Sequence, residues 1–202
     1  MSSLVDLVAE QLDDQRIRQM SQIIGADETQ TRQAVGAALP AMVAMLARNA
    51  ADDQGSQQIH AAVSRDHDGS LLDQLGPLLT GGKSNDMVSL GTSILKHMFG
   101  AKQSKVENGI GKVSGLDAAT ITKLLTLLAP IVMAALGKKQ RETGLAPTDL
   151  GGYLRREEAS ITQQSPGGTS FLGRMLDQDG DGDFDVNDAL KFGMNWLLGK
   201  KK

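Results

Sequence analysis

Near the end of the chain, the twelve residues from Asp177 to Asp188 read DQDGDGDFDVND and carry acidic side chains in alternation. When they are laid on the twelve-position calcium loop, Asp177, Asp179 and Asp181 fall at positions 1, 3 and 5. Gly182 falls at position 6, where a positive φ lets the backbone turn around the ion. The first half of the segment therefore predicts carboxylate ligands on one concave side.

The second half of the segment predicts the remaining ligands. Asp183 at position 7 offers its backbone carbonyl, Asp185 at position 9 binds directly or through water, and Asp188 closes the loop. Phe184 at position 8 is the apolar residue that anchors such a loop to a core. Six aspartates without a basic partner repel one another unless a cation neutralises them. The spacing predicts a calcium site; the alternative is a solvated acidic linker that binds no metal.

Position 12 of a calcium loop is usually Glu, which supplies two oxygens, whereas here it is Asp188. In this respect the segment resembles the loops of dockerin modules, although dockerins carry two loops and only one is present. The shorter side chain makes Mg²⁺ a competitor of Ca²⁺ for the site. Apolar residues on both sides, in 170–176 and 189–198, predict a lead-in helix and an exit helix.

Other chemistry is weakly supported by the sequence. The absence of Cys excludes disulfides and thiolate metal sites, and three His make a multi-His site improbable. His60 and His67 are interpreted as residues of a polar surface, and His97 as a helix-face residue. Ser64 to Leu75 echoes a calcium loop but ends in Leu75, so it is interpreted as a turn. Gly76–Ser84 and Asn108–Ser114 lack the spacing of a phosphate loop and are also interpreted as turns.

The composition indicates an all-α protein. Apolar residues make up 40% of the 202 residues but aromatic residues only 3%, and nine are Met, which suits packed helices better than sheets. The net charge of −3 gives no general attraction to nucleic acid. The opening MSSLVDLVAEQLDD has no basic region of the kind that begins a signal peptide. We therefore expect a cytoplasmic protein, or else export by a route without an N-terminal signal.

Two long apolar stretches, 34–47 and 124–137, each contain one proline, Pro40 and Pro130. Both stretches predict buried helices, with each proline as a kink or break. The second is shorter than the roughly 20 residues that a membrane span needs, so no transmembrane segment is expected.

The prolines lie 90 residues apart, and the turns Gly25-Ala26-Asp27 and Gly115-Leu116-Asp117 share this offset. The aspartates stand where helix N-caps belong. The pattern predicts an internal duplication of helical hairpins over residues 1–163 and a calcium-binding helix–loop–helix module over 168–202. Segments 52–55, 80–86 and 163–168 are expected to be loops because they are rich in small and polar residues.

The opening LVxxV, the turns IGAD and SGLD, the helices ALPAMV and LAPIVM, and HDGSLLDQLG at residues 67–76 together resemble a known bacterial family. It is the uncharacterised domain of unknown function nine-three-seven, with YidB-like relatives, and the resemblance covers about residues 4–160. It implies an all-α fold and no established activity, so it supplies no catalytic residues.

These observations lead to two hypotheses. In the first, the protein is non-catalytic: Ca²⁺ orders the C-terminal module, which packs on an all-α interaction domain whose partner is a protein or a second copy of the chain. In the second, the protein is an enzyme, a hydrolase, in which the calcium module is a structural staple.

Overall fold

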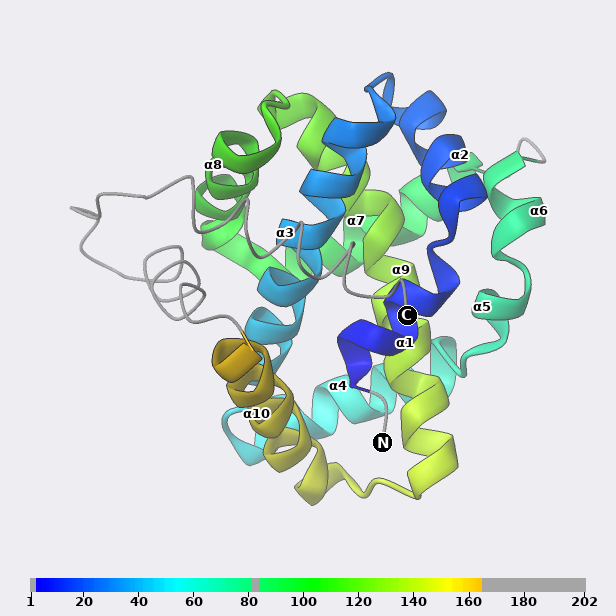
Figure 1. Cartoon of the computed structure of the whole chain (residues 1–202). Coiled ribbons are helices and arrows are strands. Elements are labelled where there is room, and N and C mark those ends of the chain that lie inside the picture. The colour runs from blue at the N-terminus through cyan, green and yellow to red at the C-terminus, as the bar shows by residue number, and fades with distance from the viewer. Residues whose placement is uncertain (1–2, 81–83, 165–202) are drawn as a thin grey trace.

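The computed structural model describes residues 3–80 and 84–164, and within these ranges every regular element is helical (Figure 1). This confirms the predicted all-α class. The elements are α1 (Leu4–Gln11), α2 (Asp14–Ile24), α3 (Glu28–Asn49), α4 (Asp53–Asp66), α5 (Ser70–Asp73), α6 (Leu75–Thr80), α7 (Ser84–Phe99), the 3-10 helix η1 (Gly100–Lys102), α8 (Gln103–Ser114), α9 (Ala118–Thr143) and α10 (Pro147–Gln164). The predicted C-terminal module and all its aspartates lie outside the described residues.

The two predicted turns set the starts of the two longest helices. Gly25 and Gly115 have left-handed φ values of 75° and 71°, which end α2 and α8. Asp27 accepts a hydrogen bond of 2.7 Å from the Thr29 amide, and Asp117 accepts one of 2.8 Å from the Thr120 amide. Both aspartates are therefore N-caps, as predicted.

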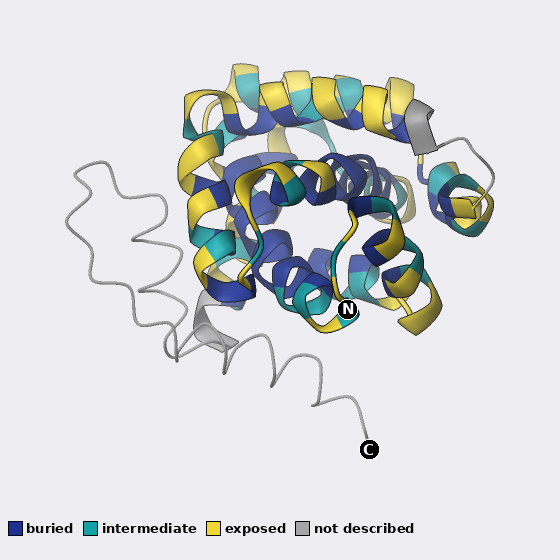
Figure 2. Ribbon diagram, turned by 90° about the horizontal axis from the view of Figure 1, so that it is seen from above, coloured by how far each residue is buried: buried dark blue, intermediate teal, exposed yellow. Residues whose placement is uncertain are grey.

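Helices α3 and α9 form the centre of the molecule. All residues of 34–47 and 124–137 are buried, because the other helices surround both stretches. Figure 2 shows buried residues gathered in the middle and exposed residues on the outer faces. The predicted buried helices are confirmed. Of the two alternatives expected at Pro40 and Pro130, a kink or a break, the break is excluded, since both prolines lie inside continuous helices.

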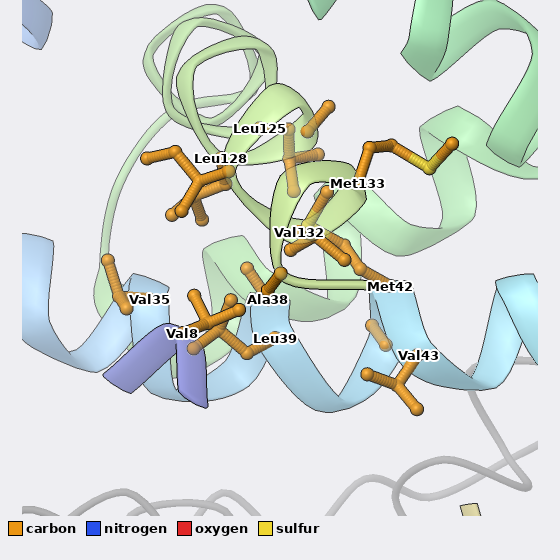
Figure 3. Packing of buried hydrophobic residues seen from close by; sticks show 14 of the residues in the cluster. Val8, Val35, Ala38, Leu39, Met42, Val43, Leu125, Leu128, Val132 and Met133 are labelled. Atoms are coloured by element: carbon orange, nitrogen blue, oxygen red, sulfur yellow. The ribbon is translucent and has the colours of Figure 1, made fainter. Parts of the chain in front are cut away.

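The two central helices pack against each other through buried side chains. Figure 3 shows Ala38 and Met42 of α3 facing Leu128 and Val132 of α9, with Val8 of α1 beside them. Around this centre, α7 lies along α9, while α10 packs on α3 and α4, and α8 packs on both central helices. The apolar stripe of each outer helix is thus buried, and its polar face remains in solvent.

Several segments expected to be loops or turns are helical. Asp52 accepts a hydrogen bond from the Gly55 amide and starts α4 one residue later, so residues 53–55 are not a loop. Residues 76–80 of the supposed turn 76–84 belong to α6, residues 84–86 belong to α7 and 163–164 to α10. The supposed turn 108–114 is the body of α8. Tertiary packing outweighs the weak helix propensity of their Gly, Ser and Asn residues.

Helix α9 is longer than its apolar stretch, with 26 residues and a mean hydropathy of 1.9 in its most apolar window. By length and composition it is the helix in the described part of the chain that could cross a membrane. However, 78% of that window is buried inside the fold, which is typical of a core helix. The described residues therefore contain no clear transmembrane segment.

Candidate functional site

In the described part of the chain, a groove of about 760 Å³ lies between α4 and α7. Its apolar lining comes from four helices: Leu46 of α3, Ile59 and Ala62 of α4, Ile94 and Met98 of α7, and Met133 of α9. Leu90 of α7 also lines it and is 38% exposed, a high value for a leucine. The groove thus combines an apolar floor with an open apolar edge.

The polar groups at the rim of this groove already serve the fold. Asp52 caps α4, and Asn49 donates a hydrogen bond of 2.8 Å to the carbonyl of Met98. His97 Nδ1 lies 2.8 Å from the Ser93 carbonyl oxygen in the same helix. The Asn49 bond links the end of α3 to α7, whereas the other two bonds are local to α4 and α7.

Arg65 and Asp66 form a second pair at the rim. The Arg65 guanidinium binds the Asp66 carboxylate through both of its oxygens, at 2.7 to 3.0 Å. This hydrogen bonding lowers the pKa of the Asp66 carboxyl and keeps it ionised. The pair is exposed, so it shapes the charge of the rim more than it stabilises the fold.

His67 differs from the interpretation as a surface residue, because it is only 7% exposed. Its backbone carbonyl lies directly against Gly137 of α9, where no side chain could fit. Burial lowers the pKa of the His67 imidazole, and the neighbouring Asp66 offsets only part of this effect. His67 is therefore neutral at pH 7 and is part of the α4–α9 contact.

The interpretation of Ser64 to Leu75 as a turn was wrong for most of its length, since residues 64–66 belong to α4 and 70–73 to α5, and the chain bends only at residues 67–69 between them. Asp68 accepts hydrogen bonds of 3.0 and 2.7 Å from the Ser70 amide and hydroxyl, and it lies 3.5 Å from Arg141 of α9. Gly69 has a φ of +95° and packs on Lys138. The Ser70 bonds and Arg141 lower the pKa of the Asp68 carboxyl. Through Asp68 and Gly69, the segment after α4 packs on Arg141 and Lys138 of α9. It is not arranged as a calcium loop.

His60 belongs to a different network from His67. Its Nε2 lies 3.1 Å from the Leu145 carbonyl oxygen and 2.6 Å from the side-chain amide of Gln140, which also reaches Ser64 Oγ at 2.7 Å. The two histidines therefore do not share a ligand. Among residues 3–80 and 84–164, no group of three or more acidic or His side chains is arranged to hold a metal ion.

The groove was not predicted from the sequence. Leu90, Ile94 and Met98 recur every four residues, so they share one face of α7, and this pattern was the available signal. This pattern could not show that α4 lies across the groove from that face of α7, because α5 and α6 separate α4 and α7 along the chain.

The helical body is similar to a family of bacterial proteins. A family model described as "Bacterial protein of unknown function (DUF937)" matches residues 6–139, from α1 to near the end of α9. Neither the curated proteins nor the solved structures contain a match to the chain.

Proposed function

Because this chain belongs to the bacterial DUF937 family, whose description gives no activity, we propose its function from its own residues: it is a non-catalytic calcium-binding interaction protein. The proposal depends above all on the register of the segment DQDGDGDFDVND, in which Asp177, Asp181 and Gly182 fall at positions 1, 5 and 6 of a calcium loop. The metal would order the helices on either side of this loop, and the resulting module would pack on the helical body.

The groove between α4 and α7 supports interaction over catalysis. Its floor is apolar, and the rim residues Asp52, Asn49 and His97 make the structural hydrogen bonds described above. An apolar centre with a polar rim is the usual anatomy of a protein-binding surface. The partner class is therefore protein, either another chain or a second copy, which sedimentation of the calcium-loaded protein distinguishes.

We also infer that the body is an internal duplication. Three pairs of residues at an offset of 90 occupy equivalent places: Gly25 and Gly115 end helices, Asp27 and Asp117 cap them, and Pro40 and Pro130 lie inside the central helices. On this basis residues 1–163 are one folding unit and 168–202 a separate module. A chain that ends at Gln164 should therefore unfold cooperatively; a gradual melt would contradict this division.

Calorimetric titration of the metal-free full chain tests the calcium site. We expect one Ca²⁺ per chain, loss of binding in Asp177→Ala and Asp181→Ala, and unchanged binding in the control Asp73→Ala, an exposed residue of α5. Ca²⁺ at about one hundred times its dissociation constant should stabilise the chain by roughly 2.7 kcal/mol if module and body unfold together. Absence of binding in the wild type would overturn the proposal.

The same preparation tests selectivity and catalysis. Trp196 is the only tryptophan and lies in the predicted exit helix, so we expect its emission to shift to shorter wavelength when Ca²⁺ binds. A second titration with Mg²⁺ measures the competition that Asp188 permits. Turnover in a screen of hydrolase substrates would contradict the proposal of a non-catalytic protein. It would favour the alternative, a hydrolase in which the calcium module only stabilises the structure.

A further inference from the structure

The end of α4 is fastened to α9 by close contacts, which we call the α4–α9 contact. The carbonyl oxygen of His67 lies so near Gly137 that a Cβ there would overlap it, and Val63 packs against the same glycine. Two residues after His67, Gly69 lies against Lys138 of α9. Contacts this close fit one arrangement of the two helices, so they are lost together when the end of α4 moves.

The imidazole of His67 is enclosed at this contact without a polar partner. The residue is buried, and its backbone amide donates a hydrogen bond to the Val63 carbonyl. Within residues 3–80 and 84–164, its ring makes no hydrogen bond. A neutral imidazole tolerates such a place better than a charged one, because an unpaired charge is far more costly to bury than a neutral polar group.

The charged groups around this imidazole already have partners or carry the wrong sign. Both oxygens of Asp66 accept hydrogen bonds from Arg65, and Asp68 lies 3.5 Å from Arg141 of α9. Lys138 of α9 adds a further cation beside the turn. Burial lowers the pKa of the imidazole, and Asp66 offsets only part of this effect. A proton on the ring therefore gains no ion pair while the contact is closed, and water is the remaining source of solvation.

The second histidine of the groove lining lies at the other end of α4. The side-chain amide of Asn49, three residues before the N-cap Asp52, lies 3.5 Å from the His97 carbonyl oxygen. Helix α4 has fourteen residues and is about 21 Å long, so roughly this length separates His97 from His67. His97 is also exposed, so its protonation does not bear on the α4–α9 contact.

We propose that protonation of His67 releases the end of α4 from α9 and so opens the groove between α4 and α7, which then offers more apolar surface to a partner in acid than at neutral pH. Leu46 and Met133 line the groove and are buried, so outward movement of α4 would expose them. The effect on partner binding rests on the proposed function, whereas the opening itself does not.

The size of the effect follows from the proton. An imidazole in water has a pKa of about 6.5, and the closed arrangement resists the proton. The ratio of open to closed molecules should therefore rise by up to about tenfold between about pH 7.5 and about pH 5.5.

Hydrogen exchange of the full chain measures this opening. After correction for the effect of pH on the chemical exchange rate, the amides of residues 63–67 should lose up to about tenfold of their protection over the same pH range. His67→Gln should abolish the loss, and the control His97→Gln should retain it. Amides of residues 41–45 in α3 should be better protected at both pH values, because they exchange only when the whole body unfolds. Equal protection of the two regions, or an unchanged response in His67→Gln, would overturn the proposal.

Nile red, an uncharged apolar dye, reports on the groove. Its emission with the wild type should increase at about pH 5.5, return to its first value when the pH is restored, and increase less with His67→Gln. Equal increases with the two proteins would overturn the connection between His67 and the groove.

These measurements separate the failure of this inference from failure of the proposed function. Protection of residues 63–67 that does not change with pH, in a chain that binds one Ca²⁺, overturns the opening alone. A response that depends on His67, in a chain that binds no Ca²⁺, supports the opening and leaves the calcium site overturned.

Discussion

Gly91 of α7 lies directly against the backbone carbonyl oxygen of Thr126 in α9, so closely that a Cβ at position 91 would overlap that oxygen. Pro130, four residues after Thr126, has no N–H, so this carbonyl lacks its usual donor within the helix. The Cα hydrogens of a glycine are the groups that can approach it there. The proline of the central helix and the glycine of α7 thus act together to bring α7 close to α9.

Gly91→Ala should therefore destabilise the protein by about 1–3 kcal/mol, because α7 must move away from α9. Helix propensity alone would favour Ala. The matched control is Gly76→Ala in α6, where a Cβ meets nothing within 4 Å and a gain of up to about 1 kcal/mol is expected. Chemical denaturation of both variants checks this pair; a stabilising Gly91→Ala would contradict the close approach.

Glu157 of α10 fastens the start of α1, since its carboxylate accepts a 2.7 Å hydrogen bond from the Leu4 amide. Glu157→Ala should cost roughly 1–2 kcal/mol in unfolding free energy, and Glu157→Gln less, because the amide oxygen still accepts the bond. Glu142→Ala, at an exposed position of α9, is the control and should have little effect. Equal losses for Glu157→Ala and Glu157→Gln would show that the hydrogen bond contributes nothing.

Asp27 and Asp117 should contribute similarly to stability, because each caps a central helix. Backbone amides that donate to them lower the pKa of both carboxyls from 3.8. A depressed folded pKa gives stability above the unfolded pKa, which is lost as the pH falls through the folded value. Asp27→Ala and Asp117→Ala should each lower the thermal midpoint at pH 7, and the difference from wild type should shrink below about pH 4. Sensitivity at only one position would count against the duplication.

His67 should make the stability of the protein depend on pH near neutrality. Its folded pKa is depressed below 6.5, so the unfolded chain binds the proton more readily and acid favours unfolding. The thermal midpoint of the wild type should fall between about pH 7.5 and about pH 5.5, and His67→Gln should remove most of this slope. His97→Gln, at an exposed residue, should retain it. An unchanged slope in His67→Gln would show that another group is responsible.

Local chemistry explains what could be predicted from the sequence. Asp27 caps its helix through amides only two and three residues away, so the residues that form the cap are close together in the sequence. The apolar runs around Pro40 and Pro130 likewise indicated burial without any knowledge of partners. The failures were of another kind: small and polar residues at 53–55 and 108–114 suggested loops, yet packing holds them in helices.

The sequence by itself determined the helical class and the starts of the central helices at Asp27 and Asp117, since each depends on residue types a few positions apart. Only the tertiary structure decided that Glu157 reaches Leu4 across 153 residues and that His67 is buried. Such relationships arise when apolar faces pack, and packing is selected by the fit of whole helices. A short stretch of sequence does not specify which distant helix face it will contact.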